Sequence, residues 1–221
     1  MDLGSSLPVV SPIVRASHLA FALLELTKPR LAFFSILTGV VGYVVADAGG
    51  GWLRASLGIL GISLAAGGTL AFNQWWERET DRWMRRTAGR PLPRREIAPR
   101  TALAWSLGLS LSGVAVLAVG TTRMAAMIAV IISVLYGWIY TPLKRRTRWA
   151  TEIGSLSGAL PPLLGAAAAG DLSARPAWAL TAAILLWQMP HFFAIGWMHR
   201  ADYRAAGFPL LPAVDPTGTR T

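Results

Sequence analysis

Long apolar stretches alternate with short charged segments along the chain. Six of these stretches cover roughly residues 31–48, 52–72, 101–119, 124–140, 153–170 and 177–198. Each is near the ~20 residues that a helix rising ~1.5 Å per residue needs to cross the hydrocarbon core of a bilayer. The pattern therefore predicts an all-α fold, a polytopic bundle of about six transmembrane helices.

Glycine and proline pairs interrupt several of these stretches, for example at 67–68 and 161–162. Such residues weaken a helix in water, but in a membrane bundle they let neighbouring helices approach closely. The stretches 101–119 and 124–140 are separated only by residues 120–123. This short connection predicts a tight antiparallel pair of helices.

The first 28 residues differ in character from the stretches that follow. They carry no basic n-region and contain Pro8 and Pro12, so they do not have the pattern of a cleaved signal peptide. The segment 13–27 is predicted to form an interfacial amphipathic helix. We therefore divide the chain into an N-terminal cytoplasmic or interfacial segment, 1–28, and a transmembrane domain, 29–221.

Composition supports a membrane protein over a soluble one, because 53% of the residues are hydrophobic and only 14% are charged. The chain has no cysteine, which excludes disulfides, cysteine-based metal sites and thiol nucleophiles. Its formal charge of +10 is compatible with nucleic acid, anionic lipid or a phosphorylated substrate.

The positions of the basic residues narrow this choice. If the N-terminus is cytoplasmic, four cytoplasmic segments hold 3, 8, 4 and 3 basic residues, 18 of the 21, and the other side holds Arg54, Arg123 and Arg175. Basic residues accumulate on the cytoplasmic side of membrane proteins. The chain is thus predicted to lie in a bacterial-type inner membrane, in contact with lipid. A nucleic-acid partner is not expected, because the charges are dispersed beside the spans.

Three oxygen-bearing side chains, Asn73, Glu77 and Asp81, follow the second stretch at intervals of four residues. If the helix continues to Asp81, they line one face, each advanced by ~40° around the axis. Carboxylate and amide oxygens suit Mg²⁺, which commonly bridges to substrate phosphates. The alternative is that both acids pair with Arg78, Arg85 or other neighbours on a solvated helix end.

A compact basic loop, residues 84–93, directly follows these acids. Arginine forks bind phosphate oxygens in bidentate fashion, so an acidic helix face beside this loop suits ionisation of an organic diphosphate. On the same predicted side, Lys144 is a candidate phosphate contact, and Tyr140 offers a hydroxyl or a ring face. Positive-inside topology explains the basic residues equally well, although not the acids among them.

The sixth stretch contains His191. An ionisable group inside a span is costly and is more often functional than structural, so His191 is a candidate acid/base group, hydrogen-bond donor or metal ligand. His199 has a weaker claim at the boundary. Asp202 lies on the same predicted side as the other acids, which suggests a second metal or phosphate contact, and Tyr203 beside it is a candidate substrate contact.

In combination, these motifs resemble the intramembrane, UbiA-type prenyltransferase superfamily. The similarity runs from about residue 26 to the end of the chain, through Asn73-x3-Glu77-x3-Asp81, Arg86-Thr87-x2-Arg90-Pro91-Leu92-Pro93, Tyr140-Thr141-Pro142-Leu143-Lys144-Arg145, Gly158-Ala159-x-Pro161-Pro162 and Trp187-Gln188-x-Pro190-His191-Phe192. The first string is typical of polyprenyl transferases in general. The second and the last resemble the branch that farnesylates haem, the protoheme IX farnesyltransferases.

The resemblance implies a helical bundle around a central cavity and a Mg²⁺-dependent transfer. A farnesyl group would pass from farnesyl diphosphate to a vinyl group of haem b, giving haem O and diphosphate in haem A and haem O biosynthesis. A haem A synthase or a terminal oxidase assembly is then a possible contact partner.

Site residues are also implied by the resemblance. Asn73, Glu77 and Asp81 would hold Mg²⁺, with Asp202 as a further metal ligand. Lys144 and Tyr140 would take part in the reaction itself. The other candidates would bind the diphosphate or the acceptor: Arg86, Arg90, Arg145, His191, Asp202 and Tyr203.

Some features depart from the family pattern. Glu77 stands where Asp is frequent, and Ala201 stands beside Asp202 where another acid is common. The resemblance implies about nine membrane helices, so the C-terminal third, about three helices after Thr221, is expected to be absent. Two alternative functions remain open, a related prenyltransferase acting on an aromatic or quinone precursor and a non-enzymatic anion-binding transporter.

Overall fold

The computed structural model describes residues 12–46, 49, 51–147 and 150–209. Within this part of the chain, all regular secondary structure is helical. Residues 1–11 of the predicted N-terminal segment, and the stretch after residue 209, lie outside this part. The all-α class is confirmed.

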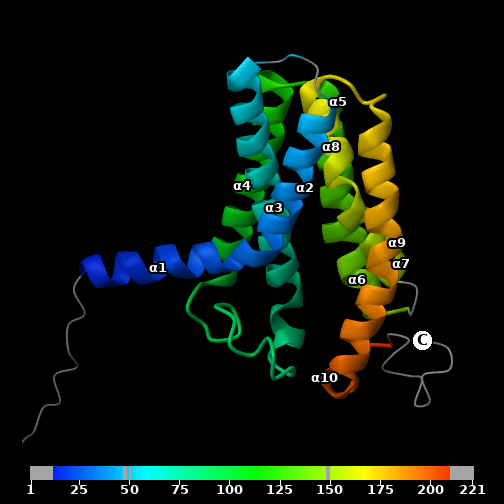
Figure 1. Ribbon diagram of the computed structural model, residues 1–221. Helices are drawn as coiled ribbons and strands as arrows, with labels where there is room; N and C mark the ends of the chain where they lie inside the picture. The colour runs from blue at the N-terminus through cyan, green and yellow to red at the C-terminus, as the bar shows by residue number, and fades with distance from the viewer. Residues whose placement is uncertain (1–11, 47–48, 50, 148–149, 210–221) are drawn as a thin grey trace, which may run out of the picture.

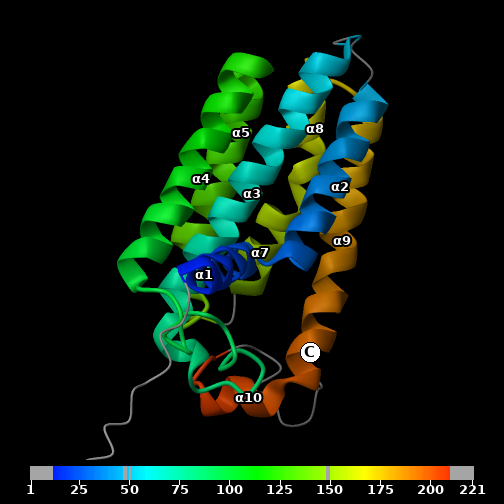
Figure 2. The same ribbon diagram turned by 90° about the vertical axis from the view of Figure 1, so that its left-hand side faces the viewer.

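Five helical stretches in the described chain are long and apolar enough to cross a membrane. They are α2 (Pro29–Ala46), α3 (Gly51–Asp81), α4 (Pro99–Gly120), the continuous run Arg123–Leu143, and α9 (Arg175–Met198). The run Arg123–Leu143 consists of α5 (Arg123–Ser133), the π-helix η1 (Val134–Tyr140) and α6 (Thr141–Leu143). These helices stand side by side in one bundle (Figures 1 and 2).

The span predicted at 153–170 is not one continuous helix. It is formed by α7 (Ala150–Ala159) and α8 (Pro161–Ala169), which follow one another along the bundle (Figures 1 and 2). The break lies at Leu160, because Pro161 and Pro162 lack the backbone N–H groups that would continue the hydrogen-bond ladder. All nine residues of α8 are buried, so this short helix is the centre of the bundle.

The predicted tight pair of helices at residues 101–140 is confirmed. Helix α4 ends at Gly120 and α5 begins at Arg123. The Thr122 side chain caps α5 by accepting a hydrogen bond from the Ala125 backbone N–H at 3.0 Å.

Glycine determines how closely the helices pack. A Cβ at Gly42 would collide with the backbone of Pro162, and one at Gly165 with the carbonyl of Gly39, so α2 and α8 make backbone contact. The predicted role of the 67–68 pair holds for Gly68, where a Cβ would meet Ser110 of α4. The close approaches therefore depend on the missing side chains.

Two short helices lie near one end of the bundle. Helix α1 (Pro12–Leu26) runs across the bundle axis, as Figure 1 shows, whereas α10 (Arg200–Ala205) lies beside the loop that follows α3 (Figure 2). The crossing orientation agrees with the interfacial helix predicted at 13–27. The loop, α10 and the last turns of α3 together form the charged end of the molecule.

Candidate active site

Helix α3 carries the three predicted metal-ligating residues on its last turns. It continues without interruption to Asp81, as the spacing required. Its 31 residues span ~46 Å, more than the ~30 Å of hydrocarbon in a bilayer. Asn73, Glu77 and Asp81 are only 1%, 3% and 0% exposed, so this face points into the protein.

A basic side chain from a different part of the chain binds each of these three residues. Lys144 Nζ lies 3.0 Å from Glu77 Oε1, and Arg90 Nη1 lies 2.6 Å from Asp81 Oδ2. Lys28 Nζ donates to Asn73 Oδ1 at 2.5 Å. We name these three cations, Lys28, Arg90 and Lys144, the cationic triad.

The basic loop folds back onto the end of α3. Thr87 Oγ1 donates to the backbone carbonyl of Asp81 at 3.0 Å, while Arg90 binds the carboxylate of the same residue. Thr87 and Leu92 are 1% and 4% exposed. The loop is therefore packed against the acids rather than spread in solvent, and it presents Arg90 in a defined place.

Two hydrogen bonds determine the orientation of the Asn73 amide. Its Nδ2 donates to Thr141 Oγ1 at 3.0 Å, so its Oδ1 is the atom that faces Lys28. Thr141 Oγ1 in turn donates to the Tyr136 carbonyl at 2.7 Å. Tyr136 belongs to η1, and π-helical segments within α-helices are frequently found at functional sites.

The position of Lys28 results from an unusual turn between α1 and α2. Lys28 has φ of 49°, in the left-handed region that residues other than glycine rarely adopt. Gln74 Nε2 donates to the carbonyls of Glu25 and Leu26 at 3.0 and 3.1 Å, which ties the end of α1 to α3. The turn thus brings Lys28 to Asn73, the neighbour of Gln74.

The two lysines of the triad have opposite pKa shifts. Desolvation, reinforced by the charges of Arg90 and Lys144, lowers the pKa of Lys28 from 10.5 to about 7, although Glu77 and Asp81 oppose this shift. Burial would also lower the pKa of Lys144, but Glu77, Tyr140 and Tyr203 together outweigh burial and raise it. Lys144 therefore remains cationic, whereas Lys28 is the cation that its surroundings stabilise least.

The residues present fit a divalent cation. Asp81 Oδ1 is buried and has no hydrogen-bond partner in the described structure, and a buried unpaired carboxylate oxygen is costly unless another group binds it. Glu77 and Asn73 offer further hard oxygen donors on the same face. Among the described residues, no group of three or more His, Cys, Asp or Glu side chains is placed to hold a metal. Asp202 thus does not complete a three-acid cluster, and its metal role stays a prediction.

The alternative pairing of the acids with their helical neighbours is not what the structure shows. Arg78 instead donates to the Trp75 carbonyl at 2.8 Å and lies 3.7 Å from Glu79. The acids are paired, but with Arg90 and Lys144, the residues that the sequence suggested as phosphate contacts.

The structure distributes the other predicted residues around this centre. Lys144 Nζ lies 5.7 Å from the ring centroid of Tyr140 and 5.2 Å from that of Phe208. Arg86 donates to the Tyr203 hydroxyl at 3.4 Å, which links the basic loop to α10. Arg145 is exposed and Asp202 is partly buried. Tyr140 and Tyr203 therefore line the cationic side of the site.

His191 lies apart from this centre, on an exposed face of α9. Its ring stacks on Trp187, with centroids 4.5 Å apart and an interplanar angle of 16°. No hydrogen bond or ring contact in the described structure connects it to Asn73, Glu77 or Asp81. His199 caps the C-terminus of α9 and is partly buried.

Two residues of the site, Lys28 and Thr141, were not predicted from the sequence. Lys28 was counted only as one of the cytoplasmic charges, and its position directly before Pro29, at the start of a span, was the available signal. Thr141 belongs to the Tyr-Thr-Pro-Leu-Lys string, but nothing in the spacing indicated that its hydroxyl would hold Asn73.

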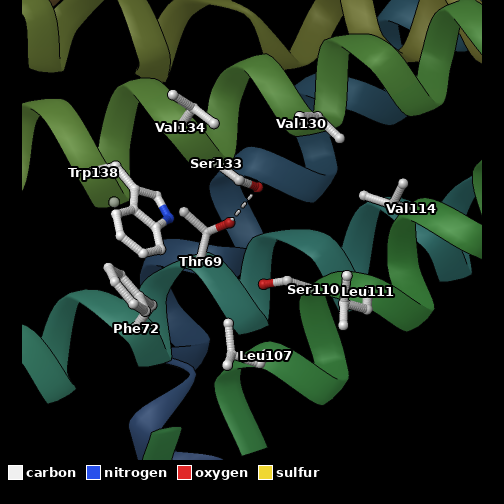
Figure 3. Close-up of a pocket in the computed structure, with 11 residues that line it drawn as sticks. Thr69, Phe72, Leu107, Ser110, Leu111, Val114, Val130, Ser133, Val134 and Trp138 are labelled. Carbon is white, nitrogen blue, oxygen red and sulfur yellow. Dashed lines mark hydrogen bonds between the residues drawn. The ribbon is translucent and has the colours of Figure 1, made fainter. Parts of the chain in front are cut away.

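An apolar groove of about 170 Å³ lies between α3, α4 and the α5–η1 run. Leu107 and Leu111 line one side, Val130 and Val134 the other, and a 2.8 Å hydrogen bond between Thr69 and Ser133 crosses the floor (Figure 3). Stacked rings of Phe72 and Trp138, with centroids 5.1 Å apart, also line it. The groove does not include Asn73, Glu77 or Asp81, so it is distinct from the polar site.

Sequence comparisons agree with the motifs. Residues 32–221 match the sequence model of the UbiA prenyltransferase family. A protein of Solibacter usitatus named protoheme IX farnesyltransferase is 43% identical over 204 residues, and one of the same name from Opitutus terrae is 41% identical over 198. These alignments cover 87% and 89% of this chain, and 70% and 67% of the relatives.

A solved structure has the same fold. A UbiA homologue from Archaeoglobus fulgidus, bound to DMAPP and Mg²⁺, superimposes with a TM-score of 0.68 at 18% identity. The match covers 86% of this chain and 68% of the homologue. Together with the five apolar helices, these likenesses identify an integral membrane protein.

Proposed function

This chain belongs to the UbiA prenyltransferase family, and on that premise we propose that it transfers a farnesyl group from farnesyl diphosphate to a vinyl group of haem b. The observation that carries the proposal is the buried face of α3, where two carboxylates and an amide meet the cationic triad. The names of the relatives support haem as the acceptor over an aromatic or quinone precursor.

Asn73, Glu77 and Asp81 would hold Mg²⁺, as the unpaired Asp81 Oδ1 favours. The ion, when bound, supplies positive charge to the diphosphate oxygens. A Mg²⁺-bound family member supports this assignment. Asp202, on α10, is proposed as an additional ligand once substrate brings the acidic groups together.

Arg90 and Lys144 stabilise the leaving group. As the C1–O bond of farnesyl diphosphate breaks, its electron pair leaves with diphosphate, and fixed cations around that oxygen lower the barrier. Arg86 and Arg145 are proposed as outer contacts, since both are exposed at the same end. Tyr140 and Tyr203, beside Lys144 and Arg86, shape the pocket and shield the reacting carbon from water.

The terminal vinyl carbon then forms the new bond to C1 of the farnesyl cation. The positive charge moves to the vinyl carbon next to the porphyrin, where water adds and loses a proton. The products are a hydroxyethylfarnesyl porphyrin, haem O, and diphosphate. A dry site bounded by aromatic rings suits the short-lived cation.

His191 is proposed as a haem contact, either at iron or at a propionate. Its exposed imidazole, stacked on Trp187, is accessible to a large planar ligand. Replacement His191→Ala should change the Soret band of haem b bound to the protein. An unchanged spectrum and affinity would exclude this role.

In orientation, the N-terminus and the charged end are proposed to face the cytoplasm of a bacterial-type inner membrane, as the 18 basic residues on that side favour. The segment 1–28 is proposed as an attachment to the membrane surface, separate from the transmembrane domain 29–221. Labelling of engineered cysteines, one in the loop 82–98 and one at residue 122, tests this sidedness because the native chain has none.

The direct test is haem analysis. Membranes containing the chain, supplied with farnesyl diphosphate, haem b and Mg²⁺, should yield haem O by liquid chromatography and mass spectrometry. Asp81→Asn should reduce the product by ~100-fold or more, whereas Glu79→Gln, a change at an exposed neighbour, should not. A prenylated quinone precursor in place of haem O would favour the related enzyme instead.

A further inference from the structure

Lys28 differs from the other two cations of the triad in its partner. Arg90 and Lys144 each bind a carboxylate, but Lys28 binds the neutral amide of Asn73. In the described structure, no carboxylate lies within ion-pair distance of Lys28. The cluster of Glu77, Asp81 and the triad therefore holds three basic groups against two acidic ones, and Lys28 is the basic group that has no acidic partner.

Several contacts fix the position of Lys28 beside α3. The left-handed backbone of Lys28 and the two hydrogen bonds from Gln74 to the end of α1 fix the turn against α3. The Asn73 amide cannot rotate freely, because Thr141 holds its Nδ2. Lys28 thus lies beside the first oxygen ligand of the acidic face, and its remaining N–H bonds are available to an anion.

We propose that Lys28 is a further residue of the diphosphate site, orienting Asn73 through its carbonyl oxygen and binding the diphosphate directly as the third cation of the triad. This inference rests on the proposed function. It identifies the turn between α1 and α2 as part of the substrate site, a region that no catalytic motif in the sequence includes.

The experiment measures binding rather than turnover. The 221-residue chain in nanodiscs of uncharged lipid is titrated with inorganic diphosphate and Mg²⁺ by calorimetry. Loss of one charged hydrogen bond to phosphate should weaken binding about tenfold or more in Lys28→Met. Lys28→Arg retains the charge and should stay within about threefold of wild type. Arg30→Met, an exposed cation two residues away, is the matched control and should bind normally.

Each outcome distinguishes the two proposals. If the wild type does not bind Mg²⁺-diphosphate, the proposed function fails. If the wild type binds and Lys28→Met binds equally well, only the role of Lys28 is overturned. Thermal unfolding is measured for each variant, and Lys28→Gln, which can still donate to Asn73, replaces the methionine variant if that one does not fold. Full diphosphate affinity in Lys28→Gln would overturn the charge role.

Discussion

The two ends of the bundle are built on different principles. At the contact of α2 with α8, Gly42 and Gly165 bring the two backbones together. At the end of α3, the helices and loops are joined by charged side chains, Lys144 with Glu77 and Arg90 with Asp81. The contact between α2 and α8 has only one arrangement, because backbone atoms, unlike side chains, cannot rotate away. The charged contacts can exchange partners, because a cation that leaves a carboxylate can bind a phosphate.

The largest effect is expected at the charged end. Asp81→Asn removes the carboxylate whose Oδ1 is unpaired, so haem farnesylation should fall by ~100-fold or more, in line with the loss of a key electrostatic group. Haem O formation in isolated membranes measures this. The unfolding temperature should also fall, because the variant loses the buried ion pair with Arg90, so haem O formation is normalised to the amount of folded protein. An anion-binding transporter would retain most of its function in this variant.

A large effect on stability is expected at the packed end. In Gly165→Ala, the new Cβ would overlap the Gly39 carbonyl, and forcing apart two helices should lower the free energy of unfolding by about 3 kcal/mol. Denaturation in mixed micelles, followed by tryptophan fluorescence, measures the loss.

Gly108→Ala is the matched control for this change. No atom lies within 4 Å of a Cβ at that position, and alanine favours helix over glycine by ~1 kcal/mol. Equal stability of the two variants would show that backbone contact between α2 and α8 does not hold the bundle together.

A smaller effect should come from Gly154→Ala. The added Cβ would lie 2.8 Å from Cε2 of Tyr140, so the ring that lies beside Lys144 must move. We expect a roughly threefold to tenfold loss of kcat, within the range of a misplaced active-site group, and a nearly unchanged unfolding temperature. Steady-state kinetics with varied farnesyl diphosphate separate kcat from KM. A fall in stability equal to that of Gly165→Ala would assign Gly154 to packing alone.

The smallest effect is expected at Arg78. Its ion pair with Glu79 is 3.7 Å long and lies at the surface, and exposed pairs contribute only ~0–1 kcal/mol. Arg78→Met should therefore leave both the unfolding temperature and haem O formation close to wild type. A large loss of activity would mean that the charged end extends beyond the cationic triad.

The sequence was sufficient to predict the elements that depend on local pattern. Apolar length predicted the helices, and four-residue spacing predicted that Asn73, Glu77 and Asp81 share a face. The break at Leu160 was missed because Pro161 and Pro162 were interpreted as residues that a membrane helix tolerates, whereas their missing N–H groups separate α7 from α8.

Long-range contacts were harder to predict. Lys28 reaches a residue 45 positions away and Lys144 one 67 positions away, and only the packing of the helices determines such pairs. The motifs marked Arg90 and Lys144 as phosphate contacts, but Lys28 was counted only as a topology signal, because a charge count does not distinguish a cation in solvent from one that lies beside a buried site.

The π-helix η1 determines the direction in which the side chains after it point around the helix axis. Each residue added to a helical turn rotates the next side chains by ~100° relative to an α-helix. Thr141 and Lys144, which follow η1, therefore lie on a different helical wheel from Ile128 and Ala129, which precede it. Deleting one residue from Val134–Tyr140 should turn Lys144 away from Glu77 while leaving the buried face of α5 intact. Seven residues of irregular winding thus allow one membrane helix to present its packing surface in one direction and the polar side chains that bind Asn73 and Glu77 in another.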